Sequence, residues 1–337
     1  MAFSSVQLKN TRLKSVGRVK IMKKLIATSA MAIALAVSAN SVSAADFDAE
    51  EAIRGLVVGG EVESFSGITF YDSDGSVDFD DGDSQLVSGL TGRLSLPLGE
   101  NLSIQTDVEF EYASEALAGS REDDHFSHSF LAGGHLSWRD PNSGLFGAFA
   151  SFGGGASDDN GSDSTRDFSY YAVGGEAQLY AGDFTLYVQG GYIDGASSDS
   201  STIVDSDALR DAFFGRGIVR WFMDPDTRVQ AEIAYVDGQN DFNEITPSDM
   251  TILEWGVRYD TMIAGLPILG DSNVFVGYRG AHFDKSSPDS AEFTEHTIMA
   301  GFTHRFGTQT IRETDRYGAT LDLPNFGRWV AAGEILE

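Results

Sequence analysis

The feature that most constrains the fold of this chain is a two-residue alternation along Leu102–Tyr112. Even positions there are apolar or aromatic apart from Thr106, and odd positions are polar. A period of two places alternate side chains on opposite faces of a β-strand. At about 3.3 Å per residue, a run of this length crosses a bilayer when it is tilted. Similar runs recur along the chain, so the sequence predicts an all-β fold.

Twelve such runs are found after residue 44, and no segment there shows a sustained helical period. Typical soluble strands have about five or six residues, and these runs are about twice as long. The predicted strands are Leu56–Ser66, Ser84–Leu98, Leu102–Ala113, His125–Arg139, Gly144–Phe152, Asp167–Tyr180, Phe184–Ile193, Leu209–Phe222, Thr227–Asp237, Met250–Tyr259, Asn273–Phe283 and Phe293–Phe306.

The connections between these runs are alternately short and long, with Asp260–Asp271 as an exception among the short ones. Short turns at one rim and long loops at the other are typical of outer-membrane barrels. We therefore predict an antiparallel transmembrane β-barrel of about twelve strands, ten to fourteen being possible. Its long loops are expected outside the cell and its short turns in the periplasm. An even strand number places both termini at the short-turn rim.

The N-terminal region has the pattern of a secretory signal. A basic Met22-Lys23-Lys24 precedes the short apolar stretch Leu25–Val37, and Val42-Ser43-Ala44 fits the small-residue cleavage rule. We expect Met22 to be the initiator, with an extended basic region as the alternative reading of residues 1–21. The predicted organisation is an upstream extension and cleaved signal at 1–44, a barrel at 45–307, and a periplasmic C-terminal tail at 308–337.

Charge limits the partners of the exported part. Residues 1–44 hold seven of the 23 basic groups and none of the 51 acidic groups, so the remainder holds 16 basic and 51 acidic groups, a formal charge of −35. Such a surface repels nucleic acid and attracts cations. The chain has no Cys, no P-loop, no zinc-binding spacing and no dinucleotide fingerprint, so we expect no metal, no cofactor and no nucleic-acid partner.

In a membrane barrel the apolar face of each strand meets lipid and the polar face lines the lumen. The predicted lumen face carries two groups of charges, which we name the acidic set and the basic set. The acidic set is Glu61, Glu63, Asp107, Glu109 and Glu111, and the basic set is Arg216, Arg220, Arg228, Arg258, Arg279 and Arg305. If the two sets face each other across water, they create a transverse field that selects ions. The alternative is that they pair and fill a closed interior, as in small barrels.

The signal, the repeated hairpins and the last strand Thr297–Phe306 together resemble a Gram-negative outer-membrane β-barrel of the broad porin-like type. The resemblance covers roughly residues 45–307 and is architectural, so it carries over no substrate. It implies that Phe306 is the terminal aromatic recognised by the barrel assembly machinery. It also implies lipid and lipopolysaccharide as partners, passage of small solutes or ions, and a possible homo-oligomer.

The tail after Phe306 departs from that pattern, because such barrels often end at the aromatic. Gly318–Val330 contains Leu321, Leu323, Phe326 and Trp329. The tail is expected either to pack back against the barrel or to be a loosely ordered periplasmic segment.

Two further candidate sites are a calcium-binding loop and a catalytic pair. The acidic loop Tyr71–Asp83 fails the calcium-loop template, which requires Gly sixth and Glu twelfth. His125 and Ser127 resemble the His-x-Ser pair of the outer-membrane phospholipase. In the predicted register, however, they share the lumen face with Ser129, and a lipid-hydrolysing pair should meet the bilayer.

The sequence therefore favours a non-enzymatic channel for passive diffusion of small hydrophilic solutes or ions through a narrow, charged lumen. One alternative is a non-conducting surface or structural barrel whose acidic loops bind cations, lipopolysaccharide or a partner. A second alternative is a barrel lipid hydrolase.

Overall fold

The computed structural model divides the chain into two compact units, Met1–Phe47 and Asp48–Glu337. The first unit lies outside the described residues, and with it the predicted initiator, apolar stretch and cleavage site. Most of the predicted long loops, including the greater part of the acidic loop, also lie outside them. The described residues are 56–73, 84–114, 125–158, 165–198, 206–241, 248–266, 270–286 and 290–336.

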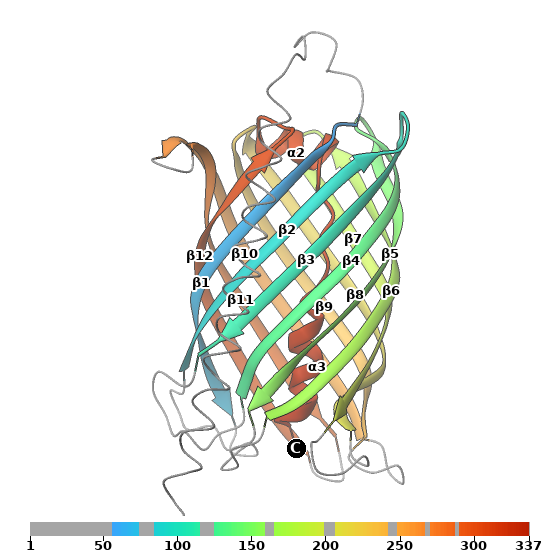
Figure 1. Cartoon of the computed structure of the whole chain (residues 1–337), viewed down its shortest axis with the longest axis vertical. Coiled ribbons are helices and arrows are strands. Elements are labelled where there is room, and N and C mark those ends of the chain that lie inside the picture. The colour runs from blue at the N-terminus through green and yellow to red at the C-terminus, as the bar shows by residue number, and fades with distance from the viewer. Residues whose placement is uncertain are drawn as a thin grey trace, which may run out of the picture. The chain divides into compact units, whose positions relative to one another are not determined.

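The described part of the second unit forms a closed antiparallel barrel of twelve strands (Figure 1). Each strand pairs with its neighbours in sequence, and β1 pairs with β12 to close the sheet. This confirms the predicted fold class. The strands are β1 Gly59–Ser73, β2 Ser84–Pro97, β3 Leu102–Ala113, β4 His125–Asp140, β5 Gly144–Asp158, β6 Thr165–Ala181, β7 Phe184–Ser198, β8 Ser206–Asp224, β9 Thr227–Asp241, β10 Ser248–Leu266, β11 Gly270–Lys285 and β12 Ala291–Phe306.

Two-residue alternation separates an apolar exterior from a polar interior. In β3, Val108 is 53% exposed, whereas its neighbour Asp107 is 4% exposed. A belt of exposed apolar side chains so extensive is a poor surface for water and a suitable one for lipid. The belt includes Leu86, Val173, Leu179, Leu186, Val188, Ile233, Leu253, Val257, Val276 and Ile298.

Exposed aromatic side chains gather near the short-turn rim. Trp138 stacks on Phe146 with ring centroids 5.2 Å apart, and Trp221 stacks on Phe184 at 6.2 Å. Tyr259 is also exposed, at 41%. Amphipathic rings at one end of an apolar belt form the girdle expected at a membrane interface.

The turn predicted at Asp260–Asp271 is wrong, because β10 continues to Leu266 and β11 begins at Gly270. Asp260, a polar residue that the sequence pattern assigned to the turn, is fully buried on the inner face of the barrel. It accepts hydrogen bonds from Arg228 and Arg258. A buried ionic contact between strands therefore explains a polar residue that sequence alone reads as a loop.

The face assigned to Ser127 also needs correction. A bulge between Phe126 and His128 leaves Ser127 without a partner on β5. A bulge inserts one extra residue and so reverses the faces on one side of it. Phe126 is accordingly buried, at 2% exposure, together with Ser129 beyond the bulge. The lumen face predicted to be shared by Ser127 and Ser129 does not extend across this point.

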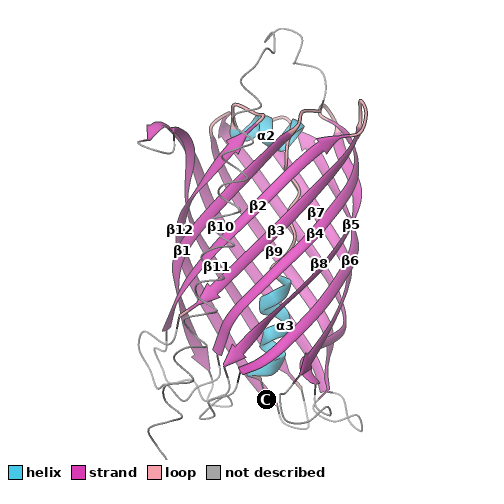
Figure 2. Cartoon of the chain, viewed as in Figure 1, coloured by secondary structure: helices cyan, strands magenta, loops and turns pink. Residues whose placement is uncertain are grey.

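After β12 the chain turns back into the barrel. Gly307 has a φ of +85°, and a Cβ there would lie 2.1 Å from the Val58 carbonyl oxygen, so the turn requires glycine. Two helices follow, α2 Ile311–Tyr317 near the short-turn rim and α3 Phe326–Ile335 within the ring of strands (Figure 2). Among the described residues, no helix is long and apolar enough to cross a membrane.

Candidate functional site

The C-terminal tail, residues 308–336, runs through the lumen from one rim to the other (Figure 1). At the short-turn rim, the backbone N–H of Arg312 donates to the carbonyl oxygen of Pro225, 3.0 Å away. At the long-loop rim, Lys285 Nζ donates to the carbonyl oxygen of Leu336, 2.9 Å away. The two ends of the tail therefore lie at opposite rims of the barrel.

This path revises the placement of the C-terminal region. Gly60 pairs with Phe306, so both ends of the sheet lie at the short-turn rim, as predicted from the even strand number. The described chain nevertheless ends at the other rim. Of the two arrangements expected for the tail, packing against the barrel is the one observed, and the tail packs against the inner wall.

The first turn of the tail is fixed by local capping. Thr310 is the N-cap of α2, and its hydroxyl accepts from the backbone N–H of Glu313 at 3.0 Å. The Glu313 carboxylate in turn accepts from the N–H of Gln309 at 2.7 Å. These bonds satisfy donors that a helix start leaves free. A helix of seven residues is marginal alone, and its contact with the barrel rim supports it.

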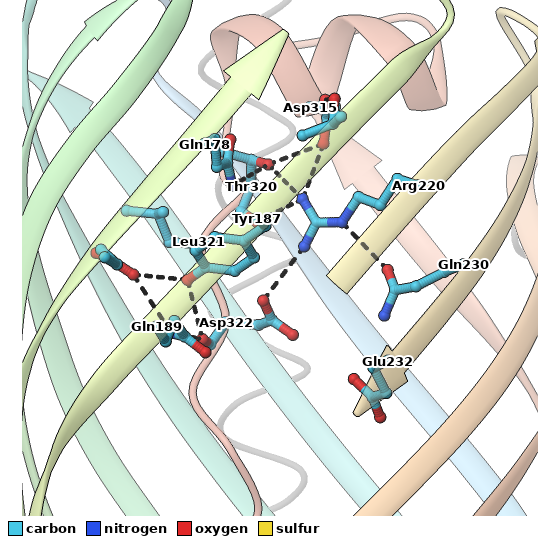
Figure 3. A network of polar contacts seen from close by, with 12 residues as sticks. Gln178, Tyr187, Gln189, Arg220, Gln230, Glu232, Asp315, Thr320, Leu321 and Asp322 are labelled. Atoms are coloured by element: carbon cyan, nitrogen blue, oxygen red, sulfur yellow. Dashed lines mark hydrogen bonds and ion pairs between the residues drawn. The ribbon is translucent and has the colours of Figure 1, made fainter. Parts of the chain in front are cut away.

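The middle of the tail is held by two arginines of β8, and Figure 3 shows the contacts of one of them, Arg220. Arg220 Nη1 donates to Asp315 Oδ1 at 2.8 Å, and its Nη2 donates to Asp322 Oδ1 at 3.2 Å. Arg216 Nη2 lies 3.1 Å from Asp322 Oδ2. Burial raises the pKa of Asp322, but the two guanidinium groups outweigh burial and lower that pKa to about 2. Asp322 is therefore a carboxylate when the tail is docked.

Uncharged wall residues bind the backbone of the same segment. Gln189 Nε2 donates to the Asp322 carbonyl oxygen at 2.7 Å, and Gln105 Nε2 donates to the Leu321 carbonyl oxygen at 2.6 Å. Tyr187, also drawn in Figure 3, donates to the Asp322 carbonyl oxygen at 3.3 Å. The extended segment thus has its backbone acceptors satisfied by the wall, as burial requires.

α3 fills the long-loop half of the lumen with an apolar core. The Trp329 ring lies 5.6 Å from that of Phe214 and 5.4 Å from that of Phe326. Trp329 and Phe326 are both fully buried. The indole Nε1 of Trp329 donates to Glu254 Oε2 at 3.0 Å, which satisfies its one polar atom.

α3 also contributes a charged side chain, Arg328, that contacts the acidic set. Arg328 Nε donates to Glu111 Oε1, and its Nη1 donates to Glu295 Oε2, each at 2.6 Å. Asn325 Nδ2 donates to the other oxygen of Glu111 at 2.9 Å. Burial lowers the pKa of Arg328, but the carboxylates of Glu111 and Glu295 raise that pKa further than burial lowers it.

The acidic set lies on the inner face, as its alternation predicts. Glu61, Glu63, Asp107 and Glu111 are each less than 9% exposed, and Glu109 is partly exposed. Asp107 has a separate environment, because its Oδ2 lies 2.8 Å from His135 Nε2. The other ring nitrogen of His135 lies 2.8 Å from Glu176 Oε1, so the imidazole bridges two buried carboxyl groups.

Three members of the basic set, Arg258, Arg279 and Arg305, pair directly with the acidic set. Arg258 donates to both oxygens of Glu63 at 2.8 and 2.7 Å. Arg279 Nη2 lies 3.2 Å from Glu111 Oε1. Arg305 Nε lies 3.3 Å from Glu61 Oε2. The other three arginines pair with carboxylates outside the acidic set: Arg216 with Glu232, Arg220 with Asp315, and Arg228 with Asp260.

Closure of the barrel brings part of the basic set beside the acidic set. The β1–β12 pairing brings the first strands beside the last ones, with Glu61 opposite Arg305 in register. The arginines of β10 to β12 therefore meet the acidic set near the seam of the barrel, whereas Arg216 and Arg220 lie on β8, away from the seam. The alternative considered for them, a paired and filled interior, describes the contacts that are present.

Several residues of the site were not singled out by sequence. Asp260 was assigned to a turn, and Asp315, Asp322 and Arg328 lie in the tail, for which no charged partner was predicted. The available signal was that these charges lie among apolar residues such as Trp329, which is unusual for a solvated tail.

Small spaces remain between the tail and the wall. One cavity of about 60 Å³ lies against Arg305, Arg228 and Asp315, and another of about 150 Å³ lies against Glu109, Tyr278 and the tail. Within the described part of the chain, no group of three or more His, Cys, Asp or Glu side chains is placed to hold a metal ion.

The closed twelve-stranded barrel, its apolar exterior and its aromatic rim are those of an outer-membrane β-barrel. Together with the even strand number, they locate the protein in the bacterial outer membrane.

No family model matches the chain, and no curated protein matches it. Among solved structures, it is similar to an outer-membrane channel from Pseudomonas putida F1, with 11% identity, 77% of this chain and 99% of that chain covered, and a TM-score of 0.46. It is similar to the β domain of the Bordetella autotransporter BrkA, with 15% identity, coverage of 74% and 100%, and a TM-score of 0.43. It is also similar to the translocator domain of the autotransporter NalP from Neisseria meningitidis, with 14% identity, coverage of 84% and 98%, and a TM-score of 0.40.

Proposed function

We propose that this protein is an outer-membrane channel for passive diffusion of small hydrophilic solutes or ions, and that its own C-terminal tail closes the lumen in the state described. No chemical step is part of this function. The observation that carries the proposal is the path of the tail, which occupies the lumen from rim to rim. Conduction then requires the tail to leave part of that path.

The character of the wall supports a channel. Arg216, Arg220, Gln105 and Gln189 bind the middle of the tail through side-chain hydrogen bonds. Each of these groups hydrates well when the tail withdraws, because water replaces carboxylate and carbonyl acceptors. A polar, charged lining of this kind is what lumens of conducting barrels present.

The non-conducting structural barrel is the second candidate, and the packing of α3 favours it. Phe326 and Trp329 lie in an apolar cluster with wall residues such as Phe149, Phe214 and Tyr170. Withdrawing the helix exposes these rings to water at a cost of about 25 cal/mol per Å² of apolar surface. On this view the tail is a permanent core.

An engineered disulfide between the tail and the wall distinguishes the channel from the non-conducting structural barrel. The chain has no Cys, so an engineered pair has no competitor. A Cβ at Gly327 would lie 2.4 Å from Ser129 Cβ. A disulfide needs about 3.8 Å between Cβ atoms, so a retreat of roughly 1.4 Å accommodates the bond.

We expect Ser129→Cys/Gly327→Cys to be silent in planar bilayers when oxidised and to show discrete openings after reduction. The single variants Ser129→Cys and Gly327→Cys control for the effect of each side chain. A chain truncated after Gly307 provides the second arm, with heat-modifiable gel migration as the check that it folds. If this folded barrel without its tail shows no conductance, the channel proposal fails and the structural barrel is favoured.

The lipid hydrolase stays a further alternative, because the described residues do not test the pair His125 and Ser127. The bulge leaves Ser127 without a partner on β5 and separates its face from that of Ser129, and the side chain of His125 lies outside the described residues. Lipopolysaccharide, the assembly machinery and a homo-oligomeric partner remain proposals, and the role of Phe306 in assembly is tested by the variant described in the Discussion.

A further inference from the structure

The smaller cavity, of about 60 Å³, is lined by five arginines and four carboxylates. Its volume is several times the roughly 10–15 Å³ that one ordered water requires. The strands contribute Arg93, Arg220, Arg228, Arg258 and Arg305 to its lining, and the tail contributes Asp315 and Asp322 among others. The cavity is therefore enclosed jointly by the wall and the docked tail.

Arg305 has donors that no protein group uses. Its side chain is 7% exposed, and neither its Nε nor its Nη1 donates a hydrogen bond. Nε lies 3.3 Å from Glu61 Oε2, which is an ion-pair distance without hydrogen-bond geometry. Leaving buried donors of a charged group unpaired is costly. A ligand that accepts hydrogen bonds at this position removes that cost.

The neighbouring carboxylates are already engaged by other arginines. Glu61 accepts from Arg93, and Glu63 accepts two hydrogen bonds from Arg258. Asp315 is bonded to Arg220 and to the hydroxyl of Thr185. The other charged groups of the lining are therefore paired within the protein, whereas Nε and Nη1 of Arg305 have no hydrogen-bond acceptor in the protein.

The chemistry of the missing acceptor follows from the guanidinium. Its donors form a planar fork that matches the spacing of two oxygens on one oxyanion. Arg228 lines the same cavity and adds a second positive charge beside Arg305. The lining is nearly all polar, with only Ile311 and Ala319 as apolar side chains. An apolar ligand finds no matching surface there.

We propose that this cavity is a binding site for a small oxyanion of the phosphate or sulfate class, with Arg305 as its principal ligand. The site exists in the closed state of the lumen, so it goes beyond the proposed channel function and does not depend on conduction.

Isothermal titration of the refolded full-length protein in detergent tests the site, with sodium phosphate and sodium sulfate as probes at constant ionic strength. Sodium chloride and sodium acetate are the comparison arms. We expect saturable binding of phosphate or sulfate and none of chloride. Saturation by acetate alone would overturn the assignment to this ligand class.

Arg305→Gln is expected to weaken phosphate and sulfate binding at least tenfold, and Arg305→Lys to weaken it as well because the fork is lost. Heat-modifiable migration establishes that each variant folds, and Arg305→Lys keeps the test available if Arg305→Gln does not fold. Arg312→Gln removes an arginine at the exposed rim, outside the cavity, and is expected to bind like the parent protein. Absence of saturable binding by the parent, or equal binding by a folded Arg305 variant, overturns the proposal.

Discussion

Arg328 Nε in α3 donates a hydrogen bond to Glu111 Oε1 in β3, 2.6 Å away. β3 is the strand whose two-residue alternation predicts the fold. Glu111 also lies 3.2 Å from Arg279 of β11. One carboxylate therefore joins the tail to two parts of the wall. Its three polar partners, including Asn325, make it the most connected member of the acidic set.

Glu111→Gln should loosen the docked tail. The change leaves two buried arginines without their shared counter-charge, and breaking a buried ion pair in this way costs about 3–5 kcal/mol. We expect a lower temperature for the heat-modifiable transition and more frequent openings in planar bilayers. Asp183→Asn is the matched control, because its pair with Arg312 is largely exposed and such pairs contribute about 0–1 kcal/mol. Equal effects of the two changes would contradict a special role for Glu111.

The tail should stay docked over the pH range in which Asp322 is ionised. Its pKa falls from an ordinary value of 3.8 to about 2 on docking. A lowered pKa contributes stability that is fully present above pH 3.8 and is lost as the pH falls through 2. The contribution is about 2 kcal/mol. We expect openings to become more frequent between pH 4 and pH 2, and to be constant from pH 5 to pH 8 as far as Asp322 is concerned.

Asp322→Asn tests the source of that pH dependence. The variant should open more often than the parent at pH 7, and its frequency of openings should change less between pH 4 and pH 2. The arginines of β8 are left intact in this variant, so their hydration in the open state is unchanged. A parent-like acid response in Asp322→Asn would assign the response to another carboxyl group.

The sequence predicted the barrel because period-two alternation depends only on neighbouring residues. Leu102–Tyr112 has the predicted faces, and the aromatic rim at Trp138 and Trp221 follows from the same pattern. Local pattern could not predict the bulge at Ser127, since one inserted residue is visible only when the partner strand is known. It also could not separate Asp260 from a turn.

The site was harder to predict because its contacts join residues far apart in sequence. The pairing of Glu61 with Arg305 depends on closure of β1 on β12. The charges of the tail acquire partners only when the tail enters the lumen, as in the contact of Asp322 with Arg216. Residue types and spacing indicated charged inner faces, but not which charges meet.

Phe306→Ala should reduce the amount of barrel in the outer membrane if Phe306 is recognised during assembly. Phe306 is the last residue of β12 and pairs with Gly60 at the closing seam. Phe302→Ala is the matched control, because it removes the same ring from the same strand further from its end. We expect membrane fractions to contain less folded Phe306→Ala than Phe302→Ala. Equal levels, with equal stability after refolding, would mean that Phe306 is not an assembly signal.

A single methyl group added at Gly327 should disturb the packing of α3. A Cβ there meets Ser129 Cβ at 2.4 Å, which is closer than side-chain carbons approach. We expect Gly327→Ala to destabilise the docked tail by about 1–3 kcal/mol, the usual cost of overpacking. Ser129→Gly removes the opposing side chain, so the double variant should recover part of the loss. Thermal transitions of the parent, both single variants and the double variant give the coupling energy, and additive effects would show that α3 does not seat against Ser129 as described.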